Sequence, residues 1–366
     1  MTAVSKPRLT KRLILFIAVG LATLFLYLFY FVGTTNVTDV IRQTNIPLYA
    51  SAFFAFVISV FFSSLTWRSL LKSIDVRISV KRALAFTWVG LFFDSVVPDP
   101  GWSGDLSKAY LLSKDLAEDG GRIAASVVGQ KIIVMGVTVL DLFLGLVLLA
   151  FNYTLPGSAI LFIALILVVT ISALVVLWYL SSSSKATKTL LDWFVRFLSF
   201  FLRGRWNSQD FRVRAENVLD KFHEGMRSLR AKPRALIRPV GLSLAAWVFD
   251  ISVVFLVFAS LKFPVSLDKV LIVYALTGSL QAWGVSLLGF TEIIMSSAYY
   301  YLGIPLTISL AATLLIRVIT LWFKLVLSYF AFQWAGVHLI LGQHPERSKI
   351  KSSESQAETR DSARDF

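Results

Sequence analysis

The stretch "PDPGWSGDLSKAYLL", residues 98–112, follows the apolar segment 80–97 and precedes another apolar segment, 123–151. It contains two prolines, two glycines and two aspartates, and then a lysine. Proline removes a backbone donor and glycine adopts non-helical conformations easily, so both residues interrupt helices. The stretch therefore predicts a break between two helical segments, and the rest of the chain indicates where such a break lies.

The composition is that of an integral membrane protein. Hydrophobic residues make up 56% of the 366 residues and charged residues only 16%. Several apolar runs are long enough to cross a hydrocarbon core of about 30 Å. The chain has no cysteine, which excludes disulfides, iron–sulfur clusters and thiolate catalysis. The three histidines, His223, His338 and His344, lack ligand spacing, so we predict no metal site and no cofactor.

Six segments are predicted to be full membrane spans. They cover about 12–32, 47–71, 123–151, 157–180, 236–260 and 305–336. The first has an apolar run longer than 20 residues and no evident cleavage site, so we interpret it as a retained span rather than a signal peptide. Two further apolar segments, about 80–97 and 269–290, adjoin stretches rich in glycine or proline.

Basic residues flank the apolar segments, which places the loops relative to the membrane. The formal charge of +14 follows this positive-inside pattern, and we therefore expect no nucleic-acid partner. The N-terminus and the loop around 68–82 are basic, and the loop 181–238 holds thirteen Lys/Arg against five acids. We expect all three on the cytoplasmic side of the cell membrane, and the C-terminal tail with them.

Between the two cytoplasmic loops lie three apolar segments, and an even number must cross. The segment 80–97 that leads into the break is therefore predicted to enter from the cytoplasmic side and return to it. The second half requires the same for residues 269–303, which are interrupted at "GVSLLGFTE" (284–292) and enter from the outside.

The two halves are thus predicted to form an inverted repeat. The first repeat covers about 47–151 and the second about 236–336. An ungapped offset of 187 aligns "GWSGDLSKAYLL" with "GFTEIIMSSAYY", so that Asp105 matches Glu292 and Gln130 matches Arg317. Inverted repeats with broken helices build substrate sites near the middle of the membrane in many transporters. We predict that Pro98, Gly101, Gly104, Gly284 and Gly289 form the two breaks.

Charged residues gather around both breaks. The first half has Asp94, Asp105, Lys108 and Lys131, and the second has Glu292 and Arg317. Charges in lipid are costly, so each should face the protein interior and have a partner, and structural ion pairing is an open alternative for each of them. Together they suit a polar, phosphorylated group. For Asp141, Asp250 and Lys324 a structural or interfacial role is favoured.

The polar segments have separate expectations. Residues 190–203, "LLDWFVRFLSFFLR", combine aromatic and basic residues and predict a helix on the inner leaflet, with anionic lipids as partners. We predict that the chain consists of a membrane transport domain, 1–340, and a disordered cytoplasmic tail, 341–366. The transport domain includes the cytoplasmic amphipathic loop 181–235.

The breaks resemble those of a known family, the flippase-like membrane domain of lysylphosphatidylglycerol synthases, which also occurs as stand-alone bacterial and archaeal proteins. Its first-half pattern of Asn, Pro, Gly-Gly-acid and Arg corresponds here to Asp94, Pro98, Gly101, Gly104, Asp105 and Lys108. Its second-half glycine element, Glu and Arg correspond to Gly284, Gly289, Glu292 and Arg317, and its Glu-Arg pair to Gln130-Lys131. The resemblance covers about 10–340. The departures at 94, 108 and 130 leave the head group of the substrate open.

The resemblance implies movement of a charged or glycosylated lipid between leaflets, without the synthase domain and without enzymatic activity. No Walker-type phosphate loop is present, so a lipid gradient, an ion gradient or downstream consumption would drive movement. A secondary transporter of a small anionic solute, a membrane-embedded transferase and a scaffold are the alternatives. The substrate expected is a membrane lipid or lipid-linked sugar, and a homodimer is possible.

Overall fold

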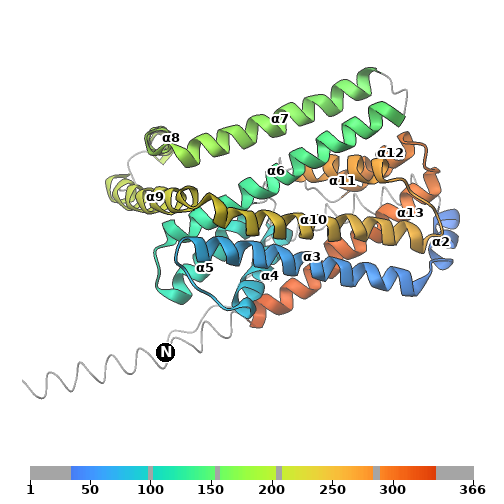
Figure 1. Ribbon diagram of the computed structural model, residues 1–366, viewed down its shortest axis with the longest axis horizontal. Helices are drawn as coiled ribbons and strands as arrows, with labels where there is room; N and C mark the ends of the chain where they lie inside the picture. Colours follow the sequence, from blue (N-terminus) through green and yellow to red (C-terminus); the bar gives the residue numbers. More distant parts are fainter. Residues whose placement is uncertain (1–33, 98–101, 153–156, 203–207, 283–288, 335–366) are drawn as a thin grey trace, which may run out of the picture.

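The computed structural model describes residues 34–97, 102–152, 157–202, 208–282 and 289–334, and every secondary-structure element in these ranges is helical (Figure 1). The predicted first span, 12–32, and the predicted tail, 341–366, lie outside the described residues. So do three of the predicted break residues, Pro98, Gly101 and Gly284. The all-α prediction is confirmed for the described part of the chain.

Five described helices are long and apolar enough to cross a membrane, and they coincide with five of the six predicted spans. They are α3 (Ile46–Ser73), α6 (Gly120–Asn152), α7 (Gly157–Ser182), α10 (Pro233–Ser260) and α13 (Leu306–Arg317), which continues through the π-helix η1 (Val318–Phe323) to Trp334. Local signals set where they begin. The Asn45 side chain accepts a hydrogen bond from the N–H of Leu48, and Pro47 follows at the start of α3.

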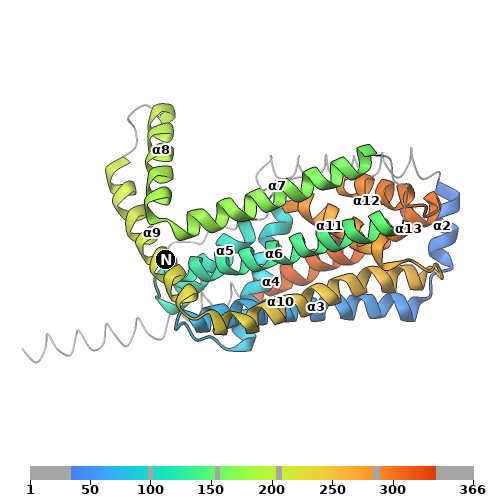
Figure 2. The ribbon, with the colours of Figure 1, turned by 45° about the horizontal axis from the view of Figure 1, so that its top comes forward.

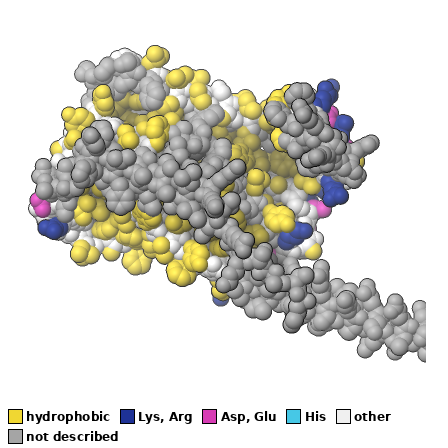
Figure 3. Space-filling model, turned by 180° about the vertical axis from the view of Figure 1, so that it is seen from behind, with side chains coloured by type: hydrophobic (Ala, Val, Ile, Leu, Met, Phe, Trp, Pro, Cys, Tyr) yellow, Lys and Arg dark blue, Asp and Glu magenta, His cyan; other side chains and the backbone are white. Residues whose placement is uncertain are grey.

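The outer surface of these helices is apolar. Large hydrophobic side chains such as Leu161, Leu165 and Val175 of α7 are more than half exposed. On the face shown in Figure 3, hydrophobic side chains occupy the middle and the charged ones lie towards the two ends of the long axis. A water-soluble fold of this size does not expose so much apolar surface. The protein is therefore membrane-embedded, with several apolar helices.

Helices α3 and α10 pack along their whole length and run antiparallel (Figures 1 and 2). At one end the N–H of Asn45, just before α3, donates to the carbonyl of Ser260, the last residue of α10, at 2.8 Å. Near the middle, the rings of Phe62 and Phe249 stack at 5.6 Å between centroids. The other membrane helices are described below by their position relative to this pair.

The first interrupted segment forms a tight helical hairpin of α4 (Val80–Val96) and α5 (Ser103–Leu116). A Cβ placed on Gly104 would lie 2.2 Å from the carbonyl oxygen of Gly90, so the two backbones touch. Arg82 pairs with Asp115 at 3.8 Å at the open end of the hairpin. Both ends of the hairpin therefore lie on one side, next to the last turn of α3.

The second interrupted segment pairs α11 (Leu267–Ala282) with α12 (Phe290–Tyr301). Gly289 precedes α12 with φ of 91°, a conformation that favours glycine, as expected for a break. The rings of Tyr299, at the end of α12, and Phe258, at the end of α10, meet edge to face at 5.0 Å. Since α11 starts a few residues after α10 ends, both ends of this hairpin lie at the C-terminal end of α10.

The two hairpins thus enter from opposite ends of the α3–α10 pair. The helix bounds match at the offset expected from the sequence. Adding 187 to the bounds of α3, 46–73, gives 233–260, the bounds of α10. The same addition carries α4, 80–96, to 267–283 against 267–282 for α11, and the start of α5, 103, to 290, the start of α12. This correspondence supports the repeat, whose crossing of a membrane stays a prediction, as does the count of six spans.

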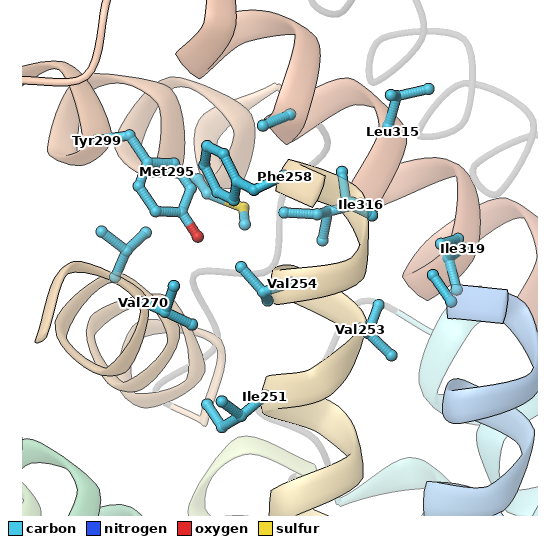
Figure 4. Packing of buried hydrophobic residues seen from close by; sticks show 14 of the residues in the cluster. Ile251, Val253, Val254, Phe258, Val270, Met295, Tyr299, Leu315, Ile316 and Ile319 are labelled. Atoms are coloured by element: carbon cyan, nitrogen blue, oxygen red, sulfur yellow. The ribbon is translucent and has the colours of Figure 1, made fainter. Parts of the chain in front are cut away.

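Buried apolar side chains join the second hairpin to the α3–α10 pair. Figure 4 shows Phe258 and Val254 of α10 facing Met295 and Tyr299 of α12, with Ile316 of α13 beside them. All five are almost fully buried. Close packing of side chains this large gains many van der Waals contacts, which hold α12 against α10 and α13.

Two amphipathic helices, α8 (Ser184–Leu202) and α9 (Ser208–Ala231), project from the bundle (Figure 2). They occupy most of the predicted loop 181–235. Lys188 of α8 pairs with Asp220 of α9 at 2.7 Å, and this hydrogen bond raises the pKa of Lys188. Helix α9 packs closely on α6, where a Cβ on Gly225 would lie 2.8 Å from the Ala125 side chain.

The glycine contact in the first hairpin generates a test of the fold. Gly104→Ala should destabilise the protein by about 2 kcal/mol or more, because its Cβ would meet the Gly90 carbonyl and the Asp94 carboxylate. Gly136→Ala in α6, where no atom lies within 4 Å of the new Cβ, is the matched control. Thermal unfolding in detergent should separate the two variants, and equal melting temperatures would contradict the described hairpin.

Candidate substrate cavity

A cavity of about 580 Å³ lies between the two halves of the chain that the sequence predicts to be repeats. Its walls come from α3, α4, α6, α10, α11, α12, α13 and η1. Twenty of its lining residues form ten pairs related by the offset of 187, among them Ser63 with Asp250, Thr87 with Tyr274 and Gln130 with Arg317. Equivalent positions of the two halves therefore line the cavity. Phe62 and Phe249, which stack on each other, are related by the same offset and are sequence neighbours of the lining residues Ser63 and Asp250.

The paired positions differ in chemistry. The second repeat contributes Asp250, Tyr274, Arg317 and Lys324, where the first contributes Ser63, Thr87, Gln130 and Val137. Asp94 of α4 is the ionisable residue that the first repeat adds to the described wall. The cavity thus has one wall with titratable groups and a facing wall of hydroxyl, amide and apolar groups.

The charged residues predicted near the first break, apart from Asp94, form one network behind the cavity wall. The Asp105 carboxylate binds Lys108 Nζ at 2.7 Å and Lys131 Nζ at 3.3 Å. Lys108 also donates to Gln130 Oε1 at 2.9 Å, and Gln130 Nε2 donates to the Ser63 carbonyl at 3.0 Å. Each ammonium lies 5.2 Å from the centre of an indole ring, Trp67 for Lys108 and Trp102 for Lys131. Two cations thus share one carboxylate.

Asp94 ties this network to the start of α5. Its Oδ1 accepts the backbone N–H of Gly104 at 2.8 Å and faces the Ser103 hydroxyl at 3.4 Å. The first N–H groups of a helix have no partner within the helix, and a carboxylate there also meets the positive end of the helix dipole. A side chain of α4 therefore holds the broken end of α5.

In the second half of the chain, Glu292 both pairs with a cation and accepts a backbone N–H at the broken end of a helix. Its Oε1 accepts Arg317 Nε at 2.6 Å, and its Oε2 accepts the N–H of Gly289 at 2.7 Å. The Glu292 residue is 1% exposed and Arg317 9%. A buried ion pair of this kind is costly to break, because the remaining charge loses its partner.

Lys324 links the two charge groups across the cavity. It follows Arg317 by seven residues on the same helix, with the π-helix between them, and both line the cavity. Lys324 interacts electrostatically with both Arg317 and Asp94. Asp94 and Arg317, which lie far apart in the sequence, therefore line the same cavity.

The structure brings together the six predicted binding residues as two ion-paired groups and the Asp94 cap. Only Asp94 and Arg317 among them line the cavity, whereas Asp105, Lys108, Lys131 and Glu292 stand behind it as partners. Asp250 and Lys324, for which a structural role was favoured, line the cavity directly. The seven-residue spacing from Arg317 to Lys324, two helical turns, is the sequence signal that could have placed Lys324 there.

The comparisons with known proteins agree with this fold. The family model described as lysylphosphatidylglycerol synthase TM region matches residues 13–328. The chain belongs to this family. The membrane protein MJ1595 of Methanocaldococcus jannaschii is 24% identical over 330 residues, which cover 89% of this chain and 95% of the relative. The membrane protein PH1989 of Pyrococcus horikoshii is 22% identical over 322 residues, 84% of this chain and 92% of the relative. Both are named as UPF0104 membrane proteins, so the resemblance stated from the break motifs is confirmed.

This family member presents cations, carboxylates and hydroxyl groups to one cavity. Arg317 and Lys324 can bind anionic oxygens such as those of a phosphate, and Asp94 and Asp250 can bind a cationic or hydroxylated group. Within the described ranges no group of three or more His, Cys, Asp or Glu side chains could hold a metal ion. The described site is thus built for a polar group that carries charge.

The Glu292–Arg317 pair can be tested by a double-mutant cycle on stability. Arg317→Ala alone should cost about 3–5 kcal/mol, because Glu292 is left buried without its cation. Adding Glu292→Gln should recover part of that loss. The matched control is the Arg82–Asp115 pair, whose side chains are 56% and 24% exposed and whose coupling should be about 0–1 kcal/mol. Equal coupling in the two cycles would contradict the buried pair.

Proposed function

We propose that this protein moves a lipid with a charged or glycosylated head group between the leaflets of the cell membrane. The observation that carries the proposal is the cavity, which is lined by residues of both halves of the chain and presents Arg317, Lys324, Asp94 and Asp250. Its volume of about 580 Å³ is in the range of small-ligand pockets, so it fits a head group while the acyl chains stay in lipid.

The proposed topology makes the two hairpins re-entrant. The hairpin α4–α5 would enter from the cytoplasmic side and α11–α12 from the outside, with both termini cytoplasmic. The entry of the hairpins from opposite ends of α3–α10 supports this topology, as does the basic composition of α8 and α9. Broken backbone at membrane depth is tolerated where it is buried in protein or lines a wet cavity. The carboxylates of Asp94 and Glu292 satisfy that requirement at the two breaks.

We further propose that α8 lies on the inner leaflet and attracts anionic lipids. Trp193, Phe194 and Phe197 are exposed on α8, and Lys185 and Lys188 lie at its start. Exposed aromatic groups beside basic residues are typical of helices in the membrane interface. Helix α8 would concentrate anionic lipids near the side of the membrane from which the hairpin α4–α5 would enter.

Lipid movement by the purified protein tests the proposal. In reconstituted vesicles that contain fluorescent phospholipids, the wild type should expose inner-leaflet probe to an external quencher faster than empty vesicles. The double variant Glu292→Gln with Arg317→Ala should reduce that rate by about tenfold or more, because the head group loses a binding cation worth about 1.4 kcal/mol or more.

The matched control is Arg82→Ala with Asp115→Asn, an ion pair at the open end of the first hairpin that does not line the cavity. Its rate should equal that of the wild type. Wild-type rates equal to those of empty vesicles with every head group tried would overturn the flippase proposal. Uptake of a soluble anion would then favour a solute transporter, and product formation in detergent would favour a transferase.

A further inference from the structure

Asp141 is the most isolated charge in the described structure. It lies on α6, eleven residues before the helix ends, and it is 1% exposed. Both carboxylate oxygens are fully buried and have no hydrogen-bond partner among the described residues. An ionised carboxylate left unpaired in a membrane interior costs several kcal/mol. Among the described residues no cation pairs with it, and a bound proton would remove its charge.

Its surroundings lead from Asp141 to the cavity. The Trp247 indole N–H of α10 interacts with Asp141 electrostatically, although it falls outside hydrogen-bond geometry. The Tyr274 hydroxyl of α11 donates to Asp250 Oδ2 at 3.1 Å and interacts with the charges of both Asp250 and Asp141. Trp247, Asp250 and Tyr274 all line the cavity, whereas Asp141 lies behind them.

The close approach of α6 and α11 holds Asp141 in this position. Gly145, one turn after Asp141, packs so tightly on α11 that a Cβ there would lie 2.9 Å from the side chain of Ile272. Ile272 precedes Tyr274 by two residues on α11, which brings Tyr274 to the same depth as Asp141. The site is therefore built from α6, α10 and α11.

The titratable group that interacts with Asp141 from the packed helices is Tyr274 of α11, which also interacts with Asp250 of α10. Helix α7 has no charged residue. Helices α5, α9 and α3 meet α6 near its first half, through contacts such as Lys108 with Gln130, Gly225 with Ala125 and Trp67 with Ser126. The cavity cations Arg317 and Lys324 make no ion pair with Asp141 or Asp250 in the described residues.

We propose that Asp141, together with Asp250 on the cavity side of Tyr274, forms a proton-binding site whose protonation is coupled to lipid movement. This inference rests on the proposed function for its coupling and stands on its own for proton binding. A cation such as Na⁺ would need several oxygen ligands, but the Trp247 N–H beside Asp141 is a donor that repels a cation. A proton needs only one carboxylate oxygen.

Protons reach the pair from the cavity. Asp250 meets the cavity directly and accepts the Tyr274 hydroxyl, whereas Asp141 lies behind Trp247 and Tyr274, so a proton reaches Asp141 past these two side chains. The first repeat cannot do the same, since the offset of 187 puts Ser63 opposite Asp250 and Thr87 opposite Tyr274. Protonation therefore changes the charge of one wall only, next to Arg317 and Lys324 where a head group would bind.

Infrared difference spectra between acidic and alkaline buffer test proton binding without any lipid assay. The wild-type protein in detergent should show the carbonyl band of a buried, protonated carboxylic acid, and Asp141→Asn should lose it. Asn is neutral and close in shape, so the variant should fold. Asp39→Asn, at an exposed position of α2 (Thr34–Arg42), is the matched control and should keep the band. A band that survives in Asp141→Asn and in Asp250→Asn overturns proton binding, and so does one that requires Na⁺.

The coupling is tested in vesicles that contain a fluorescent phospholipid and carry a pH difference of one unit. With one proton per lipid, the wild type should drive up to about a tenfold asymmetry of the probe between leaflets, equivalent to about 1.4 kcal/mol. Asp141→Asn should still move lipid but leave the probe evenly distributed. Wild-type movement without asymmetry overturns the coupling and leaves the flippase proposal intact. Absence of any lipid movement by the wild type overturns the flippase proposal and the coupling with it, whereas the infrared test alone decides proton binding.

Discussion

The structure depends on one constraint, that backbone groups freed by a helix break in an apolar protein must be satisfied by the protein itself. Among the described residues, a carboxylate in each half satisfies one of these groups. Asp94 reaches from α4 to the Gly104 N–H at the start of α5, and Glu292 reaches back to the Gly289 N–H at the start of α12. A carboxylate so placed carries a charge that needs a cation in turn. Arg317 meets this need for Glu292, and in the other half Lys108 and Lys131 pair with Asp105, the acid on the helix that Asp94 caps.

The same constraint explains why some of the predicted charged residues line the cavity while the others stand behind its wall as ion-pair partners. An ion pair that is satisfied behind the wall, such as Asp105 with Lys108, holds its helices in place and leaves little charge for a ligand. Groups with remaining hydrogen-bond capacity face the cavity. Arg317 serves in both layers, since its Nε binds Glu292 while its residue lines the cavity. It joins the broken helix α12 to whatever occupies the space.

The sequence predicts the architecture better than the site, for physical reasons. Loop charges and apolar length decide which segments can cross a membrane, and both can be counted along the chain. The offset of 187, found from the alignment of Asp105 with Glu292, also matches the helix bounds. Contacts between helices cannot be counted in this way. Lys108 meets Gln130, and Asp250 meets Tyr274, only because particular helix faces pack together. The sequence therefore favours a structural role for Asp250 and Lys324, although both line the cavity.

The pseudo-two-fold relation also bears on how such a molecule could move. Phe62 and Phe249 are equivalent residues that stack on each other, so their contact is preserved if the two repeats exchange conformations. The contact between α3 and α10 would therefore stay fixed during such a movement. The hairpins α4–α5 and α11–α12 would move relative to it, and each would take up the conformation that the other had before. A fully symmetric pair of repeats would give the two exchanged states equal energy. Here Asp250, Tyr274, Arg317 and Lys324 have no ionisable counterpart, so charge bound to one wall shifts the balance between the states. The asymmetry of the wall, rather than the fold that the repeats share, would decide which of the two states is favoured when charge binds, whereas a gradient across the membrane would set the direction of transport.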